Sequence, residues 1–291
     1  MNLIDISSWQ KGIDLATLFD KNPALDGVIV KATQGTSYTN PEYAGWTRWL
    51  YTNGKPFGVY HFLDTGDAKT EAEHFYNIVK PYIGKAIPIA DYEGDALYKG
   101  AVWLRQFLER FRELSGVRCM IYCSLSVCKT LTGLTDYPLW VAQYADNKTV
   151  NGFLDHPWQS GSVAPWTSYV MHQYTSCGRL TGYNGSLDFD LFYGTVDDWN
   201  KLCEGKQSAP TPAPTPTPAT LKDPDPAVIS AILSGRYGVN SARRNALKAA
   251  GYDPDKCQTK VNELYSIAAK VKQDVGKNMA YINSIVKIAR S

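Results

Sequence analysis

Residues 86–93 have the sequence Ala86-Ile87-Pro88-Ile89-Ala90-Asp91-Tyr92-Glu93, and this stretch points to the fold of the first part of the chain. Its apolar first half predicts a short buried strand. Two acidic residues end the stretch, two positions apart. Because side chains two apart on a strand point to the same side, we expect Asp91 and Glu93 to stand next to each other where the strand leaves its sheet.

Seven more apolar runs of similar length occur before residue 192. They cover residues 3–6, 27–31, 57–62, 118–122, 139–143, 169–173 and 187–191. Between the early runs, residues 40–53, 69–80 and 102–114 have apolar side chains at helical spacing. Alternating strands and helices predict a parallel sheet, and eight strands predict a closed, TIM-like α/β barrel. The later runs are joined by loops without clear helices, so we expect the last third of the barrel to be irregular.

Polar residues lie within or just after the second half of these runs. They are Asp5, Lys31, Tyr60, His61, Asp91, Glu93, Tyr122, Trp140, Gln143, Gln173 and Asp188. In barrel enzymes the carboxyl ends of the strands form the active face. The alignment therefore predicts a catalytic site at that end of the barrel.

Four carboxyl groups would meet there, namely Asp5, Asp91, Glu93 and Asp188, with Lys31 as the nearby cation. Crowded anions raise the pKa of at least one carboxyl group. A protonated carboxylic acid beside a carboxylate is suited to cleaving a glycosidic bond. We expect Glu93 to be the general acid, because its longer side chain reaches a leaving-group oxygen, and Asp91 to face the anomeric carbon or its neighbour.

Aromatic residues near the same strand ends are candidates for walls that stack on a sugar. They are Tyr60, Phe62, Tyr122 and Trp140, and ordinary core packing is the alternative for each of them. Other chemistries lack their motifs, since the chain has no Gly-x-Ser-x-Gly, no His-Glu-x-x-His and no glycine-rich phosphate loop. The histidines and the six scattered cysteines have no metal-ligand spacing. We expect neither a cofactor nor a metal.

Residues 1–205 resemble the glycoside hydrolase family 25 lysozymes, as found in phage endolysins and bacterial autolysins. The resemblance is carried by the segments 5–7, 30–33, 58–62, 91–93, 121–122, 139–144, 172–175 and 187–190. It implies an irregular barrel of eight strands with about five helices. It also implies hydrolysis, with retention, of the β-1,4 bond between N-acetylmuramic acid and N-acetylglucosamine in bacterial peptidoglycan.

The resemblance also implies roles for individual residues. Glu93 would be the acid/base, and Asp91 the nucleophile or the residue that orients a participating acetamido group. Asp5 and Asp188 would support them, although Asp190 shares a strand face with Asp188 and either could do so. The substrate would contact Lys31, Tyr60, Phe62, Tyr122, Trp140 and Gln173. One departure from the family pattern is Gln34, where a glutamate is frequent.

Residues 206–220 alternate proline with threonine and alanine, which predicts an extended linker between domains at 1–205 and 221–291. The second domain is basic, with 11 Lys and Arg against 6 Asp and Glu over residues 223–291. Its segments 233–238, 243–253 and 261–264 resemble the cell-wall-binding repeat CW_7, a small three-helix bundle that binds muropeptide. We place the contact near Arg236, Tyr237, Gly238 and Arg243.

The final segment predicts a helix that continues to about residue 288. Apolar residues recur along it at helical spacing, at Val261, Leu264, Ala268, Val271, Val275, Ile282 and Ile285. This stripe either packs on its own bundle or pairs with a second copy, and we expect self-association as a homo-oligomer.

The first residues lack the basic start and apolar core of a secretion signal. We therefore expect the protein in the cytoplasm of a bacterial host, acting on peptidoglycan after the membrane is permeabilised, without nucleic-acid binding or membrane insertion. Two alternatives stay open: a chitinase-like glycosidase and a catalytically inactive wall-binding protein.

Overall fold

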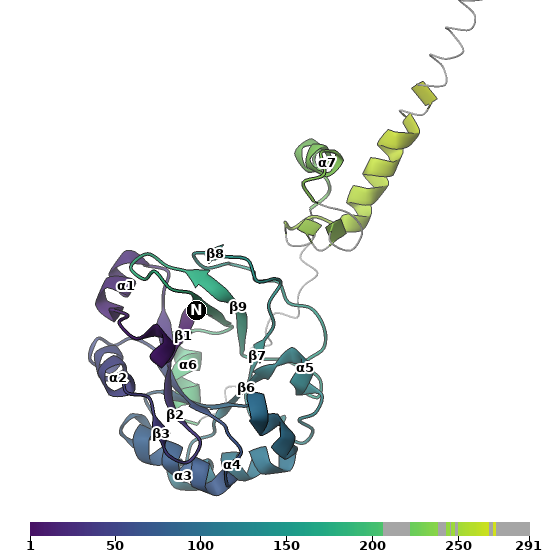
Figure 1. Cartoon of the computed structure of the whole chain (residues 1–291). Coiled ribbons are helices and arrows are strands. Elements are labelled where there is room, and N and C mark those ends of the chain that lie inside the picture. Colours follow the sequence, from purple (N-terminus) through teal and green to yellow (C-terminus); the bar gives the residue numbers. More distant parts are fainter. Residues whose placement is uncertain (206–221, 238–242, 245, 248–249, 268–269, 272–291) are drawn as a thin grey trace, which may run out of the picture. The chain divides into compact units, whose positions relative to one another are not determined.

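The computed structural model describes residues 1–205, 222–237, 243–244, 246–247, 250–267 and 270–271 (Figure 1). They form two compact units, one on each side of the predicted linker. The linker at 206–220 and Gly238 lie outside the described residues, so the proposed domain limits stay a prediction. Each unit is described by itself.

The N-terminal unit is a closed eight-stranded barrel, as predicted. Its strands are β1 (Asn2–Ile6), β2 (Gly27–Gln34), β4 (Phe57–Phe62), β5 (Ile87–Asp91), β6 (Met120–Ser124), β7 (Leu139–Ala142), β9 (Met171–Arg179) and β10 (Leu187–Phe192). The ring closes because β1 pairs with both β2 and β10. Two short strands, β3 (Tyr38–Thr39) and β8 (Val150–Asn151), pair with β2 and β9 outside the ring.

One strand of the ring departs from the expected parallel sheet. β10 runs antiparallel to both of its neighbours, β9 and β1. The short loop at 180–186 joins β9 to β10 directly, whereas a parallel pair needs a long crossover connection. Asp188 therefore lies at the start of its strand, not in the second half. It still reaches the predicted face, because it is in register with Asp5 near the end of β1.

Helices surround the barrel on the outside. In the described part of this unit they are α1 (Leu15–Lys21), α2 (Tyr43–Thr52), α3 (Ala68–Val79), α4 (Gly100–Ser115), the single turn α5 (Leu125–Cys128) and α6 (Val196–Cys203), with 3-10 turns η1 (Ser8–Gln10), η2 (Lys80–Tyr82) and η3 (Gly94–Lys99). The N-cap of α3 is Asp67, whose carboxylate accepts a hydrogen bond from the backbone N–H of Thr70. The C-cap of α4 is Gly116, which has a left-handed φ of 74°.

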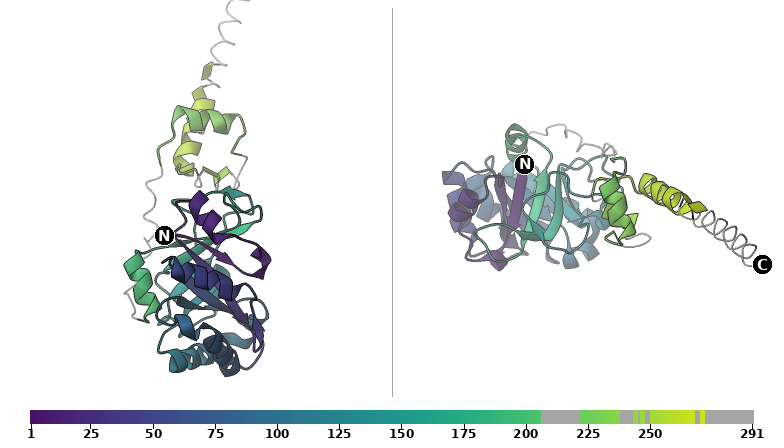
Figure 2. Two further views of the ribbon diagram at one scale, coloured as in Figure 1. Left: turned by 90° about the vertical axis from the view of Figure 1, so that its left-hand side faces the viewer. Right: turned by 90° about the horizontal axis from the view of Figure 1, so that it is seen from above.

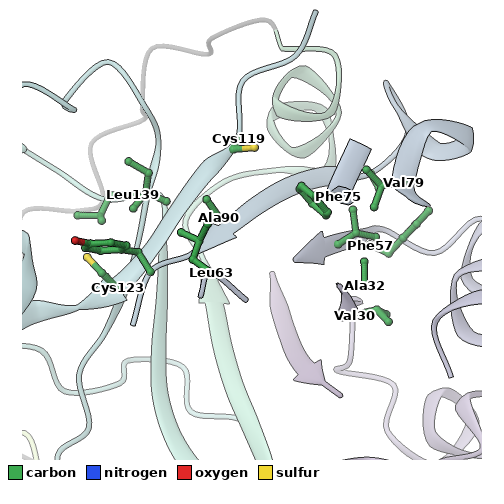
Figure 3. Packing of buried hydrophobic residues seen from close by; sticks show 14 of the residues in the cluster. Val30, Ala32, Phe57, Leu63, Phe75, Val79, Ala90, Cys119, Cys123 and Leu139 are labelled. Carbon is green, nitrogen blue, oxygen red and sulfur yellow. The ribbon is translucent and has the colours of Figure 1, made fainter. Parts of the chain in front are cut away.

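Two apolar layers hold the barrel together. The outer layer lies between strands and helices, where Phe75 of α3 stacks on Phe111 of α4 with ring centroids 4.9 Å apart. Figure 3 shows Phe75 and Val79 next to Phe57 of β4. The inner layer fills the barrel and continues into α6, where Trp199 packs edge-on against Phe192. α6 thus closes the end of the barrel opposite the predicted site (Figure 2).

A buried polar network joins the barrel to α3. Nδ1 of His61 lies 2.7 Å from the hydroxyl of Thr33, and Nε2 lies 3.1 Å from the Glu71 carboxylate. Glu71 also accepts hydrogen bonds from the backbone N–H groups of Asp64 and Gly66. The sequence analysis placed His61 among the polar residues of the predicted active face. In the structure its side chain instead points away from the barrel interior and stabilises the loop after β4.

The C-terminal unit is helical. Asp225 is the N-cap of α7 (Pro226–Leu233), where its carboxylate accepts a hydrogen bond from the N–H of Val228. Further helical residues lie at 243–244, 246–247 and 254–267. Their small core comprises Val228, Ile229, Ile232, Leu247, Cys257 and Val261. Within the described ranges of the chain, every helix is too short or too polar to span a bilayer.

The predicted apolar stripe is described only in part. Val261 is buried in the small core, whereas Leu264 and Val271 are exposed. Ala268, Val275, Ile282 and Ile285 lie outside the described residues. Self-association through the stripe stays a prediction.

We predict that Glu71→Gln lowers the free energy of unfolding of the barrel by about 1–3 kcal/mol, because in either orientation the new amide N–H faces a buried backbone N–H. Urea denaturation of the full chain measures this. Glu73→Gln is the control, since Glu73 lies on the same helix, is half exposed and pairs with Arg110; its cost should stay below about 1 kcal/mol. Equal costs for the two variants would contradict the role given to the network.

Candidate active site

A cavity of about 300 Å³ opens at the end of the barrel where β1, β5 and β6 finish. Its lining residues are Asp5, Ser7, Trp9, Gln10, Lys31, Tyr60, Phe62, Asp91, Glu93, Tyr122, Trp140, Tyr144, Gln173 and Asp188. Ten of these are the residues predicted for the catalytic and substrate-binding site, so the structure brings all of that set together. Ser7, Trp9, Gln10 and Tyr144 are additional. Gln143 is not among the lining residues.

Asp91 and Glu93 stand side by side in the cavity wall. Asp91 is the last residue of β5, and Glu93 continues the extended backbone with φ −149° and ψ −171°. Gly94, with φ +58°, then turns the chain into η3. Two extended residues place both carboxyl groups on the same side, which is how they come to share one cavity.

Burial and mutual repulsion change the acidity of the carboxyl groups. Desolvation raises the pKa of Asp91 well above its usual range, and the charges of Glu93 and Asp5 raise it further. Desolvation also raises the pKa of Glu93. The pKa of Asp188 rises to about 6, mainly through burial. A group that keeps its proton near neutral pH is therefore available in this cavity.

Lys31 opposes this repulsion. It is the one Lys or Arg that lines the described cavity, and its charge lowers the pKa of both Asp91 and Glu93. Its ammonium group donates to Oε1 of Gln34 at 2.7 Å and lies 4.5 Å from the ring centroid of Phe62. Gln34, which departs from the family pattern, thus fixes the position of the cation.

Asp5 is held by a chain of hydrogen bonds across the barrel. The amide of Gln173 donates to Oδ2 of Asp5 at 2.6 Å. The carbonyl oxygen of Gln173 accepts from Tyr122 at 2.7 Å and from Tyr144 at 2.5 Å. Both tyrosines therefore fix the orientation of the amide, and the amide fixes Asp5. Most of the polar capacity of Gln173 is used within the protein.

The predicted aromatic walls form the floor of the cavity. Tyr60, Tyr122 and Trp140 are buried, and Tyr122 packs edge-on against Trp140 with centroids 4.5 Å apart. Only Phe62 of the four is partly exposed. The freely exposed aromatic face at the rim belongs instead to Trp9, which is 89% exposed.

Trp9 follows Asp5 closely in the chain and is presented by a small fixed turn. The hydroxyl of Ser7 accepts from the N–H of Trp9, and the Gln10 side chain accepts from the N–H of Ser7. This is a capping box. Its signature, Ser-x-x-Gln directly after the first predicted strand, is the signal in the sequence that would have located Trp9.

The residues proposed for wall binding are partly described. Tyr237 packs against the small helical core. Nη1 of Arg243 donates to Oε1 of Gln258 at 3.3 Å. Arg236 is exposed, and Gly238 lies outside the description. In the part of the chain that the structure describes, no group of three or more His, Cys, Asp or Glu side chains is arranged to hold a metal ion.

Known proteins resemble this chain in sequence and in fold. Residues 4–183 match Glycosyl hydrolases family 25, and residues 226–265 match the CW_7 repeat. The autolytic lysozyme of Clostridium acetobutylicum is 29% identical over 66% of this chain, which spans only 56% of that protein. The lysozyme of Streptococcus phage Cp-7 is 24% identical over 90% of this chain and 69% of its own length.

A solved structure resembles the barrel as well. The bacterial lysozyme of Streptomyces coelicolor superposes with a TM-score of 0.59 at 21% identity, over 71% of this chain and 98% of that one. The family match covers residues 4–183 of 291, well over half of the sequence. The chain therefore belongs to glycosyl hydrolases family 25.

Proposed function

We propose that this chain is a modular muramidase that hydrolyses the β-1,4 bond between N-acetylmuramic acid and N-acetylglucosamine in peptidoglycan, with retention of configuration. The observation that carries the proposal is the shared cavity of Asp91 and Glu93, inside a barrel of a family that contains lysozymes. Two carboxyl groups at one cavity can divide the work of proton donation and attack.

Glu93 would act first, as the general acid. Its raised pKa keeps a proton available, which it gives to the leaving-group oxygen as the glycosidic bond breaks. Asp91 would stabilise the positive charge that develops at the anomeric carbon, either by attacking it or by orienting an acetamido group that does so. Glu93 would then remove a proton from the incoming water.

The remaining acids would set the charge of the cavity. Asp5, held by Gln173, adds negative charge next to Asp91, and Asp188 lies opposite Asp5 on β10. Trp9 would supply a flat apolar face on which a sugar ring stacks at the rim.

The C-terminal unit would tether the enzyme to its substrate. It matches the CW_7 repeat, and the similarity to the phage Cp-7 lysozyme extends over most of the chain. These similarities support an endolysin that reaches the wall from the host cytoplasm once the membrane is breached. Timed expression of the chain in bacteria, with and without a pore-forming protein, tests this: lysis should require the pore-forming protein. Pairing through Leu264 and Val271 is a further part of the proposal, tested by the molar mass in solution.

We predict that Glu93→Gln lowers turnover of purified peptidoglycan by about 10²- to 10⁴-fold, because the amide keeps the shape but cannot donate the proton. Asp95→Asn, at an exposed position two residues further on, should leave turnover unchanged. Mass spectrometry of the released fragments should find new reducing ends on muramic acid. Reducing ends on glucosamine, or an active Glu93→Gln variant, would overturn the assignment.

We predict opposite pH shifts from two charge changes at the cavity. Activity falls as pH rises through the pKa of Glu93, because the general acid is then ionised. Lys31→Met removes a charge that lowers the pKa of Asp91 and Glu93, so the whole pH profile of kcat/KM should move to higher pH. Asp188→Asn removes a like charge that interacts with Glu93, so the alkaline limb should move to lower pH. Shifts in the same direction would contradict the electrostatic account.

We predict that the C-terminal unit retains the enzyme on cell walls. In a Glu93→Gln background, truncation after residue 205 should abolish co-sedimentation with purified walls. Arg236→Ala should weaken binding at high ionic strength, where simple charge attraction is screened. Lys260→Ala, which removes one charge elsewhere in the unit, is the control and should matter only at low salt. Equal retention of the truncated chain would exclude the tethering role.

A further inference from the structure

A fifth carboxyl group, Asp190, lies inside the barrel directly beneath the cavity. It follows Asp188 by two residues on β10 and pairs with Gln173 of β9 and with Leu3 of β1. Its side chain is fully buried and does not line the cavity. Substrate therefore does not touch it, and the catalytic steps described above leave it without a role.

The surroundings of Asp190 contain acids and phenols but no described cation. Asp5 of β1 lies against it, and Asp188 is on its own strand. Tyr144 after β7 and Tyr174 of β9 are the other ionisable groups that interact with it. Burial and the charges of Asp5 and Asp188 raise the pKa of Asp190 well above its usual range, whereas the adjacent indole N–H of Trp140, a hydrogen-bond donor, lowers it.

Neither oxygen of Asp190 receives a hydrogen bond of normal geometry from any described residue. An ionised carboxylate here would be fully desolvated and next to another acid, with the Trp140 indole N–H but no described cation to offset its charge, which is a costly arrangement in a protein interior. A neutral carboxyl group removes the charge. It also gains a hydroxyl donor, and the carboxylate of Asp5 is the acceptor within reach.

We propose that Asp190 is a positioning residue that stays protonated and donates its hydroxyl hydrogen bond to Asp5, from beneath the floor of the cavity. Asp5 would then be held by two donors, the amide of Gln173 and the hydroxyl of Asp190. Burial and the charge of Asp188 raise the pKa of Asp5 well above its usual range, and both hydrogen bonds oppose that rise and favour the ionised form. Asp190 would act on Asp91 only through Asp5, whose charge raises the pKa of Asp91.

This proposal rests on the proposed function for its kinetic consequence but not for the protonation state itself. It also assigns different roles to the two acids of β10. Asp188 faces the cavity and titrates with a pKa of about 6, whereas Asp190 is sealed from solvent and holds its proton.

Two substitutions separate a neutral donor from a charged group. Asp190→Asn keeps the shape, the neutrality and an N–H donor, so it should retain most of kcat/KM. Asp190→Leu removes the donor, so kcat should fall on the order of 10- to 100-fold with little change in KM. Its acid limb should move to higher pH, because Asp5 then becomes easier to protonate. The proposal would be overturned if the Asp190→Asn variant were as inactive as the Asp190→Leu variant, or if both variants were fully active.

Infrared difference spectroscopy of the full chain tests the proton without any hydrolysis. At mildly alkaline pH, the carbonyl stretch of a protonated carboxyl group should be present in the wild type and reduced in Asp190→Asn. Asp188→Asn is the matched control on the same strand, and the band should be unchanged because Asp188 is ionised there. A band that Asp190→Asn leaves intact would refute the neutral state of Asp190, whatever the enzyme cleaves.

Discussion

Four carboxyl groups are desolvated in one cavity, and the cost of their burial, increased by mutual repulsion, is the constraint on which the barrel interior depends. Asp5, Asp91, Glu93 and Asp188 line one opening, and Lys31 is the one Lys or Arg side chain that the described cavity sets against them. The fold does not neutralise the cluster. Burial and mutual repulsion raise the pKa values of these groups, which favours their protonated forms.

Such a cluster is stable only because its neighbours are fixed. Gln34 and the Phe62 ring hold Lys31, and Tyr122 and Tyr144 orient Gln173 against Asp5. Beneath them, the buried aromatic rings of Tyr60, Tyr122 and Trp140 form the floor. Gln173 was predicted to contact substrate, but most of its hydrogen-bonding capacity is used by Asp5, Tyr122 and Tyr144. The open part of the site is the rim, where Trp9 is exposed.

The barrel strands could be located from the sequence, because a strand that is buried on both faces consists of a short run of apolar residues. The pair Asp91 and Glu93 followed from the two-residue period of that strand. The direction of β10 did not follow, since the same apolar run is compatible with either direction, and only the length of the preceding loop separates them. Residues whose role depends on a partner distant in sequence were missed or misjudged for the same reason. Tyr144 reaches Gln173, and His61 reaches Glu71, through contacts that no local spacing encodes.

The antiparallel last strand also has a consequence for how the enzyme comes into being. Asp5 lies on the first strand of the barrel and Asp188 on the last, and these strands are neighbours only in the closed ring. During synthesis, the first strand has one edge unpaired until residues 187–192 have left the ribosome. A nascent or prematurely terminated chain therefore contains Asp91 and Glu93 but lacks a closed site around them. Completion of the site therefore coincides with completion of the barrel, because a fragment that stops before residue 187 lacks both Asp188 and the strand that closes the ring next to Asp5.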